Sequence, residues 1–88
     1  MIESMLVLST GHLTSQTCNV YLPSAPFSAF EKGDVGWFVY ATDDPPEDLP
    51  ADLALCITHA RQHGCTWLMF DCHYELIEGL PDYTEQWS

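Results

Sequence analysis

The chain has 88 residues, with 13 acidic residues against two basic ones and a formal net charge of −11, yet 47% of it is hydrophobic. That apolar and aromatic content excludes a disordered acidic tail, which would lack the residues needed for a core. The charge excludes nucleic acid and anionic membranes as direct partners and favours a basic protein surface. We expect one domain spanning residues 1–88.

The targeting and cysteine patterns predict a soluble, cytoplasmic protein. The start of the chain lacks a basic region, and its apolar run at residues 5–8 is too short for a signal peptide. No run approaches the ~20 apolar residues that cross a bilayer. The cysteines Cys18, Cys56, Cys65 and Cys72 form no CxxC pair, so we expect reduced thiols, no metal and no cofactor.

The first half of the chain predicts a strand, a helix and a hairpin. Residues 5–8 are apolar and are followed by turn formers, as in a buried strand. Thr14 has the position of a helix N-cap, and the helix is expected over residues 15–22, ending at the proline that follows. A less regular strand at 26–31 then turns into a strongly apolar strand at 36–41.

The second half predicts a loop, a helix, a strand and a tail. The segment 43–48 contains two prolines and four acids, which favour an extended, solvated loop. A helix is expected to begin between residues 48 and 50, to carry one apolar stripe and to stop at Gly64. A buried strand follows at 66–70, and residues 74–88 form an aromatic and acidic tail.

This order predicts an α+β fold with two helices on a three- to four-stranded sheet. We favour the ferredoxin-like βαββαβ plan, in which the first and last strands run antiparallel, over a small parallel sheet. The strands are apolar on both faces, since Trp37 and Val39 alternate with Phe38 and Tyr40. Two helices cover only one face, so the tail, or a second chain, is expected to cover the other.

Clustered carboxylates form the main candidate site. Five acids lie within ten residues of the chain: Asp43, Asp44, Glu47, Asp48 and Asp52. At ~3.1 Å per residue this is about one charge per 6 Å, or half the phosphate density of one DNA strand. Together with Asp71, Glu75 and Glu78 they predict a phosphate-like array for a basic nucleic-acid channel, anchored by an exposed Tyr74 or Trp87. The alternative is an acidic surface that only maintains solubility.

Two further functions stay open. A small interaction module or homodimer would use the uncovered sheet face, around Trp37, Val39 and Trp67. A Cys/His enzyme would need parallel strands whose carboxyl ends bring catalytic groups together. The residues that would gather there are Thr10, His12, Asp71, Cys72 and His73. The negative field disfavours the thiolate of Cys72, and we expect no enzyme.

Three segments, residues 8–14, 36–40 and 60–71, resemble an uncharacterised family of small proteins found on bacterial plasmids and integrated mobile elements. The resemblance covers most of the chain and brings no catalytic residues. This chain has Cys72-His73-Tyr74 where the family usually has a polar, glycine-containing stretch. Small acidic proteins of mobile elements are similar to anti-restriction and anti-CRISPR inhibitors. The resemblance therefore implies a non-enzymatic inhibitor that occupies a basic, nucleic-acid-binding surface of a host defence complex, such as a CRISPR surveillance complex.

Overall fold

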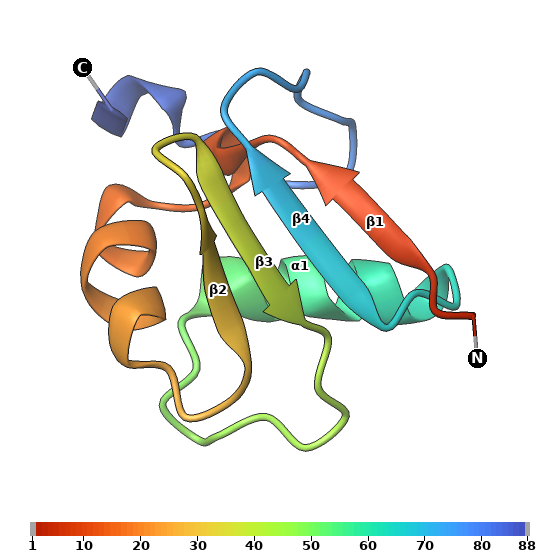
Figure 1. The fold of residues 1–88 in the computed structure, drawn as a ribbon. Helices are drawn as coiled ribbons and strands as arrows, with labels where there is room; N and C mark the ends of the chain where they lie inside the picture. Colours follow the sequence, from red (N-terminus) through yellow and green to blue (C-terminus); the bar gives the residue numbers. More distant parts are fainter. Residues whose placement is uncertain (1, 88) are drawn as a thin grey trace.

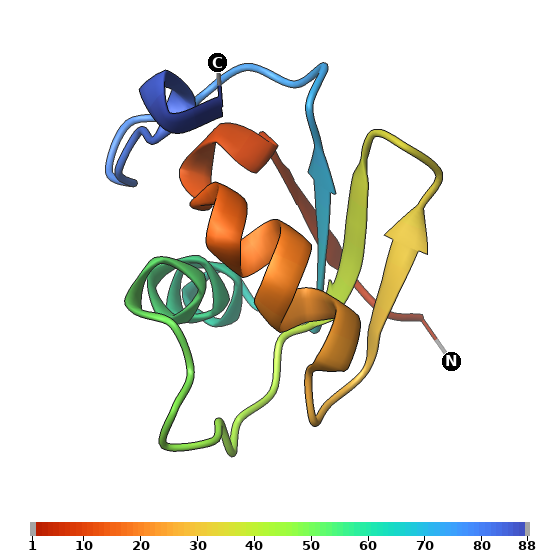
Figure 2. The same ribbon diagram turned by 90° about the vertical axis from the view of Figure 1, so that its left-hand side faces the viewer.

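The computed structural model describes residues 2–87, and for residues 86 and 87 it describes only the backbone. The chain forms a four-stranded sheet with helices on one face (Figures 1 and 2). The strands are β1 (Met5–Leu8), β2 (Ala29–Lys32), β3 (Gly36–Tyr40) and β4 (Trp67–Asp71). The helical elements are η1 (Thr10–His12), η2 (Thr17–Tyr21), η3 (Leu22–Ser24), α1 (Ala51–Gln62) and η4 (Thr84–Trp87). The predicted α+β class, with two main helices on a four-stranded sheet, is confirmed.

The strand order is β1-β4-β3-β2, which differs from the ferredoxin-like prediction. The first and last strands, β1 and β4, lie side by side and run parallel, whereas β3 runs antiparallel to both of its neighbours. The sheet is therefore mixed, neither ferredoxin-like nor fully parallel. A physical reason is visible for β2, which carries Glu31 and Lys32 and takes an edge position where charged residues meet solvent.

The core lies between the sheet and the two helices. Alternate strand residues point into it, and the apolar stripe of α1 packs against them, as the helical periodicity predicts. Each core side chain is at most 4% exposed. The members are Leu8, Leu13, Cys18, Leu22, Val39, Ala41, Leu53, Cys56, Ile57, Ala60, Leu68 and Phe70.

Asp52 joins the starts of the two helices. The predicted N-cap is confirmed, because the Thr14 hydroxyl accepts the N–H of Thr17 at 3.1 Å. The Asp52 carboxylate, in the first turn of α1, accepts the N–H of Thr14 at 2.8 Å and the hydroxyl of Thr17 at 3.0 Å. The first helical segment spans residues 15–24, two residues further than predicted, because Pro23 fits into the closing 3-10 turn.

The residues after β4 wrap around the end of the sheet next to η1. The fully buried His12 donates from Nδ1 to the Pro81 carbonyl at 2.8 Å and accepts the Ile77 N–H at Nε2, at 3.0 Å. The Tyr83 N–H donates to the Gly11 carbonyl at 2.8 Å. Both ribbon views place this tail at the end of the sheet and on its helix side (Figures 1 and 2). The prediction that the tail covers the second sheet face is therefore wrong, since no described part of the tail lies over that face.

Candidate functional site

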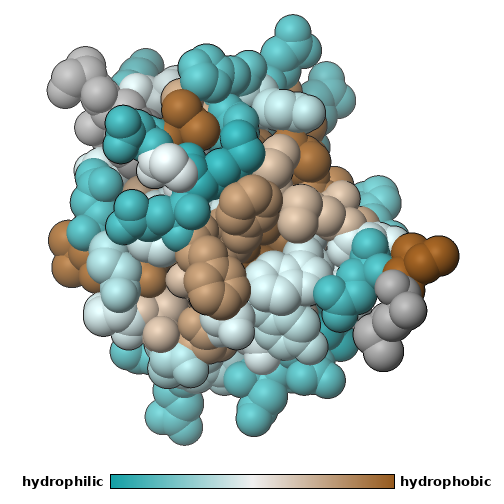
Figure 3. Space-filling model, in the orientation of Figure 1, coloured by the Kyte–Doolittle hydropathy of each residue, from teal (hydrophilic) through white to brown (hydrophobic). Residues whose placement is uncertain are grey.

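The open sheet face carries a ladder of apolar side chains in two cross-strand rows. The strand register aligns Val7, Met69, Phe38 and Phe30 in one row and Met5, Trp67 and Tyr40 in the other. We call these seven residues the apolar face. Figure 3 shows them as a hydrophobic to neutral band across the sheet, bordered by hydrophilic residues.

Aromatic contacts give this apolar face a defined shape. The ring of Trp67 meets that of Tyr40 edge-on at 5.4 Å and that of Phe30 at 6.4 Å between centroids. Phe30 is 58% exposed, Met5 43% and Tyr40 37%. Aromatic residues and methionine are the residue types enriched at protein interfaces. The arrangement therefore offers a partner a large, partly rigid apolar contact.

Polar groups close both ends of the apolar face. At one end the Trp67 indole N–H donates to a Glu3 carboxylate oxygen at 2.8 Å. At the other, the Lys32 ammonium contacts Asp71 at 2.9 Å, across Gly36 in the strand between them. A side chain at Gly36 would collide with the backbone of β4, because a Cβ there would lie 1.6 Å from the Phe70 carbonyl oxygen.

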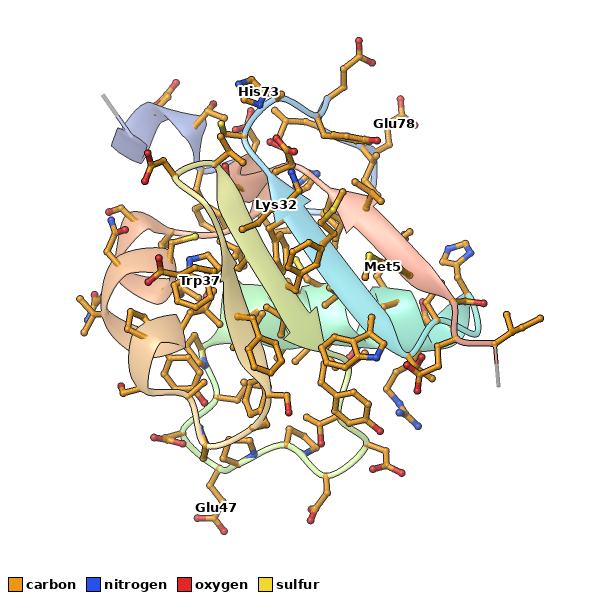
Figure 4. The ribbon with its side chains drawn as sticks, in the orientation of Figure 1. Met5, Lys32, Trp37, Glu47, His73 and Glu78 are labelled. Atoms are coloured by element: carbon orange, nitrogen blue, oxygen red, sulfur yellow. The ribbon has the colours of Figure 1, made fainter. Side chains whose placement is uncertain are left out.

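The predicted acids fall into two exposed groups at opposite ends of the molecule. Asp43, Asp44, Glu47 and Asp48 are exposed in the loop between β3 and α1. Glu75 and Glu78 are exposed in the tail. Figure 4 places the labelled Glu47 and Glu78 at opposite ends of the view, in a molecule 39 Å long. The acids therefore do not form one continuous array, and the loop alone keeps four clustered charges.

The other predicted contact residues differ in their burial and in their hydrogen bonds. Asp52 and Asp71 are each 6% exposed and are occupied by the hydrogen bonds described above. Tyr74 is 51% exposed, whereas the side chain of Trp87 lies outside the described residues. We therefore retain the loop acids and Tyr74 as surface candidates and assign Asp52 and Asp71 structural roles.

Our prediction placed the wrong set of alternate strand residues on the uncovered face of the sheet. Val39 is fully buried in the core and Trp37 packs on the helix side, so of the three predicted residues only Trp67 belongs to the apolar face. Phe38 and Tyr40 take their places. The sequence reading also missed Met5, Val7 and Phe30, because only the pairing of the edge strands shows that they extend the same rows.

Parallel pairing of β1 with β4 brings the predicted Cys/His residues to one end of the sheet, but not in a catalytic geometry. Both ring nitrogens of His12 are occupied by the tail. Nδ1 of His73 contacts both partners and lies 3.9 Å from the Cys72 sulfur and 3.0 Å from an Asp71 oxygen. A nucleophile–base–carboxylate relay uses the two different nitrogens of the imidazole. The contacts of Cys72, His73 and Asp71 therefore do not have the geometry of such a relay.

The same three consecutive residues bring possible metal-ligand atoms together. One atom each of Asp71, Cys72 and His73 lies within 4.8 Å of the others. The Asp71 carboxylate is already bound by Lys32 and by the His73 N–H. These contacts lower the Asp71 pKa to about 2, with the Lys32 hydrogen bond as the largest cause. The group is thus an ion-pair network that stabilises the end of β4.

These features define a small acidic α+β domain with a bare apolar sheet face. The chain belongs to the family described as "Family of unknown function (DUF5983) C-terminal domain", whose model matches residues 5–85. No curated protein and no solved structure matches the chain. No helix among residues 2–87 is long and apolar enough to cross a membrane.

Proposed function

We propose that this protein is a non-enzymatic binding protein that occupies a basic, nucleic-acid-binding surface of a partner, as an inhibitor of a bacterial defence complex would. The observation that carries the proposal is the bare apolar face on a chain of net charge −11. Monomers rarely leave a large contiguous apolar patch exposed, and such patches commonly mark interaction sites.

The apolar face and the acids have different tasks in this proposal. Aromatic and methionine side chains that become fully desolvated supply most of the affinity in an interface. Exposed acids raise the association rate and select basic partners, but add less affinity. The acidic loop, residues 43–48, directly follows β3, so its charges lie next to one end of the apolar face (Figure 1). A basic partner that contacts this end meets both features.

The charge balance favours such a partner over a second copy of the chain. Both basic side chains make internal contacts, Lys32 with Asp71 and Arg61 with the Ala41 carbonyl. Face-to-face pairing of two copies would bring two net charges of −11 together. The open face itself still supports a homodimer as the second candidate, and high salt would favour it. A dimer that persists in sedimentation at high salt would select this candidate.

The test is affinity capture from bacterial lysate followed by elution with nucleic acid. The immobilised wild-type protein should retain nucleic-acid-binding proteins that single- or double-stranded oligonucleotides release. Phe30→Ser should lose most of this capture, since Phe30 is 58% exposed on the apolar face. Leu55→Ser is the matched control, because Leu55 is 48% exposed on α1, away from that face.

Two results would contradict the proposal. One is retention of the captured proteins in the presence of excess oligonucleotide, which would mean that the bound surface is not the one that holds nucleic acid. The other is equal capture by the Phe30→Ser and Leu55→Ser proteins, which would remove the apolar face from the interface. Replacing the four loop acids by amides should slow association at low salt and have less effect at high salt.

A further inference from the structure

A pocket of about 620 Å³ lies on the side of the sheet opposite the apolar face. It opens where β1, β2 and β4 end, between the β2–β3 turn, the helical segment 15–24 and the tail. Its wall includes Glu31, Asp34, Trp37, Asn19, Cys72 and Thr84. Figure 4 shows Trp37 between the hairpin and that helical segment. The volume is in the usual range of about 300–1,000 Å³ for small-ligand sites.

The pocket combines an aromatic wall with two carboxylates that lack a cation. Glu31 pairs across the strands with Trp37, so both side chains stand on the same face of the hairpin. Asp34 follows in the turn. No described residue donates a hydrogen bond or forms an ion pair to either carboxylate. Lys32, the nearest basic residue in the sequence, stands on the other face and binds Asp71.

Such a wall recognises organic cations. A guanidinium or ammonium group is attracted to the face of an indole and donates charge-assisted hydrogen bonds to carboxylates. The neutral oxygens of Asn19 and Thr84 supply further acceptors in the same wall. A negatively charged surface without an aromatic wall would attract any cation. An indole beside carboxylates instead favours a cation with a flat or alkylated face.

We propose that this pocket binds an alkyl guanidinium or ammonium group, presented either by a free small cation or by an arginine or lysine side chain of another protein. The pocket faces away from the apolar face, so this inference is independent of the function proposed above. Each can fail while the other holds.

The test is a titration of the isotope-labelled full chain, followed by NMR at the indole N–H of Trp37. The probes are ethylguanidinium chloride and Nα-acetyl-arginine amide, at constant ionic strength. Both should shift this signal and the amides of residues 31–36 to saturation. Similar affinities would point to a free cation, whereas much tighter binding of the arginine derivative would point to a side chain of a partner.

Matched variants separate recognition from general attraction. Glu31→Gln with Asp34→Asn should weaken binding by at least about tenfold, since charge-assisted hydrogen bonds are lost. Asp43→Asn with Asp44→Asn removes the same charge from the distant acidic loop and should weaken binding by less than about threefold at physiological salt. Equal weakening by the two double variants would overturn the proposal. So would equal binding of Nα-acetyl-citrulline amide, which keeps the shape of arginine without its charge.

Discussion

Asp71, at the end of β4, forms an ion pair with Lys32 at the end of β2. The ammonium of Lys32 and the N–H of His73 lower its pKa from 3.8 to about 2 in the folded protein. The unfolded chain lacks these partners, so its carboxyl keeps an ordinary pKa. A depressed folded-state pKa contributes stability above the unfolded value, and this contribution is lost as the pH falls from about 4 to about 2.

Asp71→Asn should therefore remove a pH-dependent part of the stability. Near pH 6 the variant should have a lower free energy of unfolding than the wild type, and the difference should shrink as the pH approaches about 2. Urea unfolding at a series of pH values measures this. Both proteins share the remaining acids, so the titration of those acids cancels in the difference between the two free energies of unfolding. A difference that stays constant with pH would contradict the assigned role of the Lys32 contact.

Three of the four cysteines should differ clearly in reactivity. Burial, aided by the charge of Asp52, raises the pKa of Cys18 and of Cys56 to about 12, whereas Cys72 is exposed. Alkylation by iodoacetamide, read by mass spectrometry, should modify Cys72 readily in the native protein. Cys18 and Cys56 should react at least about 10³-fold more slowly, because they must wait for unfolding. Fast native labelling of Cys56 would instead show that α1 opens locally.

At the scale of elements, the sequence predicted the secondary structure of each segment better than its position in the sheet. The strand at 5–8, the Thr14 cap and the stripe on α1 are local patterns, and each was confirmed, although of the strand expected to be buried only Leu8 is buried and Met5 is exposed. The sequence of β3 and β4 did not show which alternate residues face the core. Both sets are apolar, so no polar set marks the solvent side. Strand order was not predictable either, because it depends on chain crossovers rather than on local pattern.

The same distinction applies to the candidate site. Sequence alone identified the acids of the exposed loop, since prolines and clustered charge keep such a segment solvated. It could not show that Asp52 turns inward, because that depends on the distant Thr14 and Thr17 as partners. It also could not assemble the pocket, whose wall combines the hairpin, the first helix and the tail.

The tail depends on one histidine. His12 is fully buried, and its two ring nitrogens hold Pro81 and Ile77. His12→Ala should destabilise the protein by about 2–3 kcal/mol, because two buried backbone groups lose their partners. Hydrogen exchange at the Ile77 amide should accelerate more than in the core strands. His63→Ala, an exposed histidine at the end of α1, should change the stability by less than about 0.5 kcal/mol. Equal effects of the two variants would contradict this role.

At the scale of the whole molecule, charge opposes compactness. Thirteen acids against two bases give a net charge of −11 on a chain of 88 residues, so the folded state repels itself. Raising the salt concentration screens this repulsion. A gain of about 1 kcal/mol would raise the Tm by about 4–8 °C for a domain of this size. Thermal unfolding at low and high potassium chloride measures this effect, and a Tm that falls with salt would contradict it.

The central place of β4 also governs how the chain reaches this structure. Its neighbours are β1, from the start of the chain, and β3, from the middle, yet β4 itself is made only at residues 67–71. During synthesis the β2–β3 hairpin can form early, whereas β1 must wait with its backbone groups unpaired. Such long-range pairing slows folding. The ribosome must therefore deliver residues 67–71 before the sheet can close, and a nascent chain cut before residue 67 would hold β1 and the β2–β3 hairpin with no strand to join them.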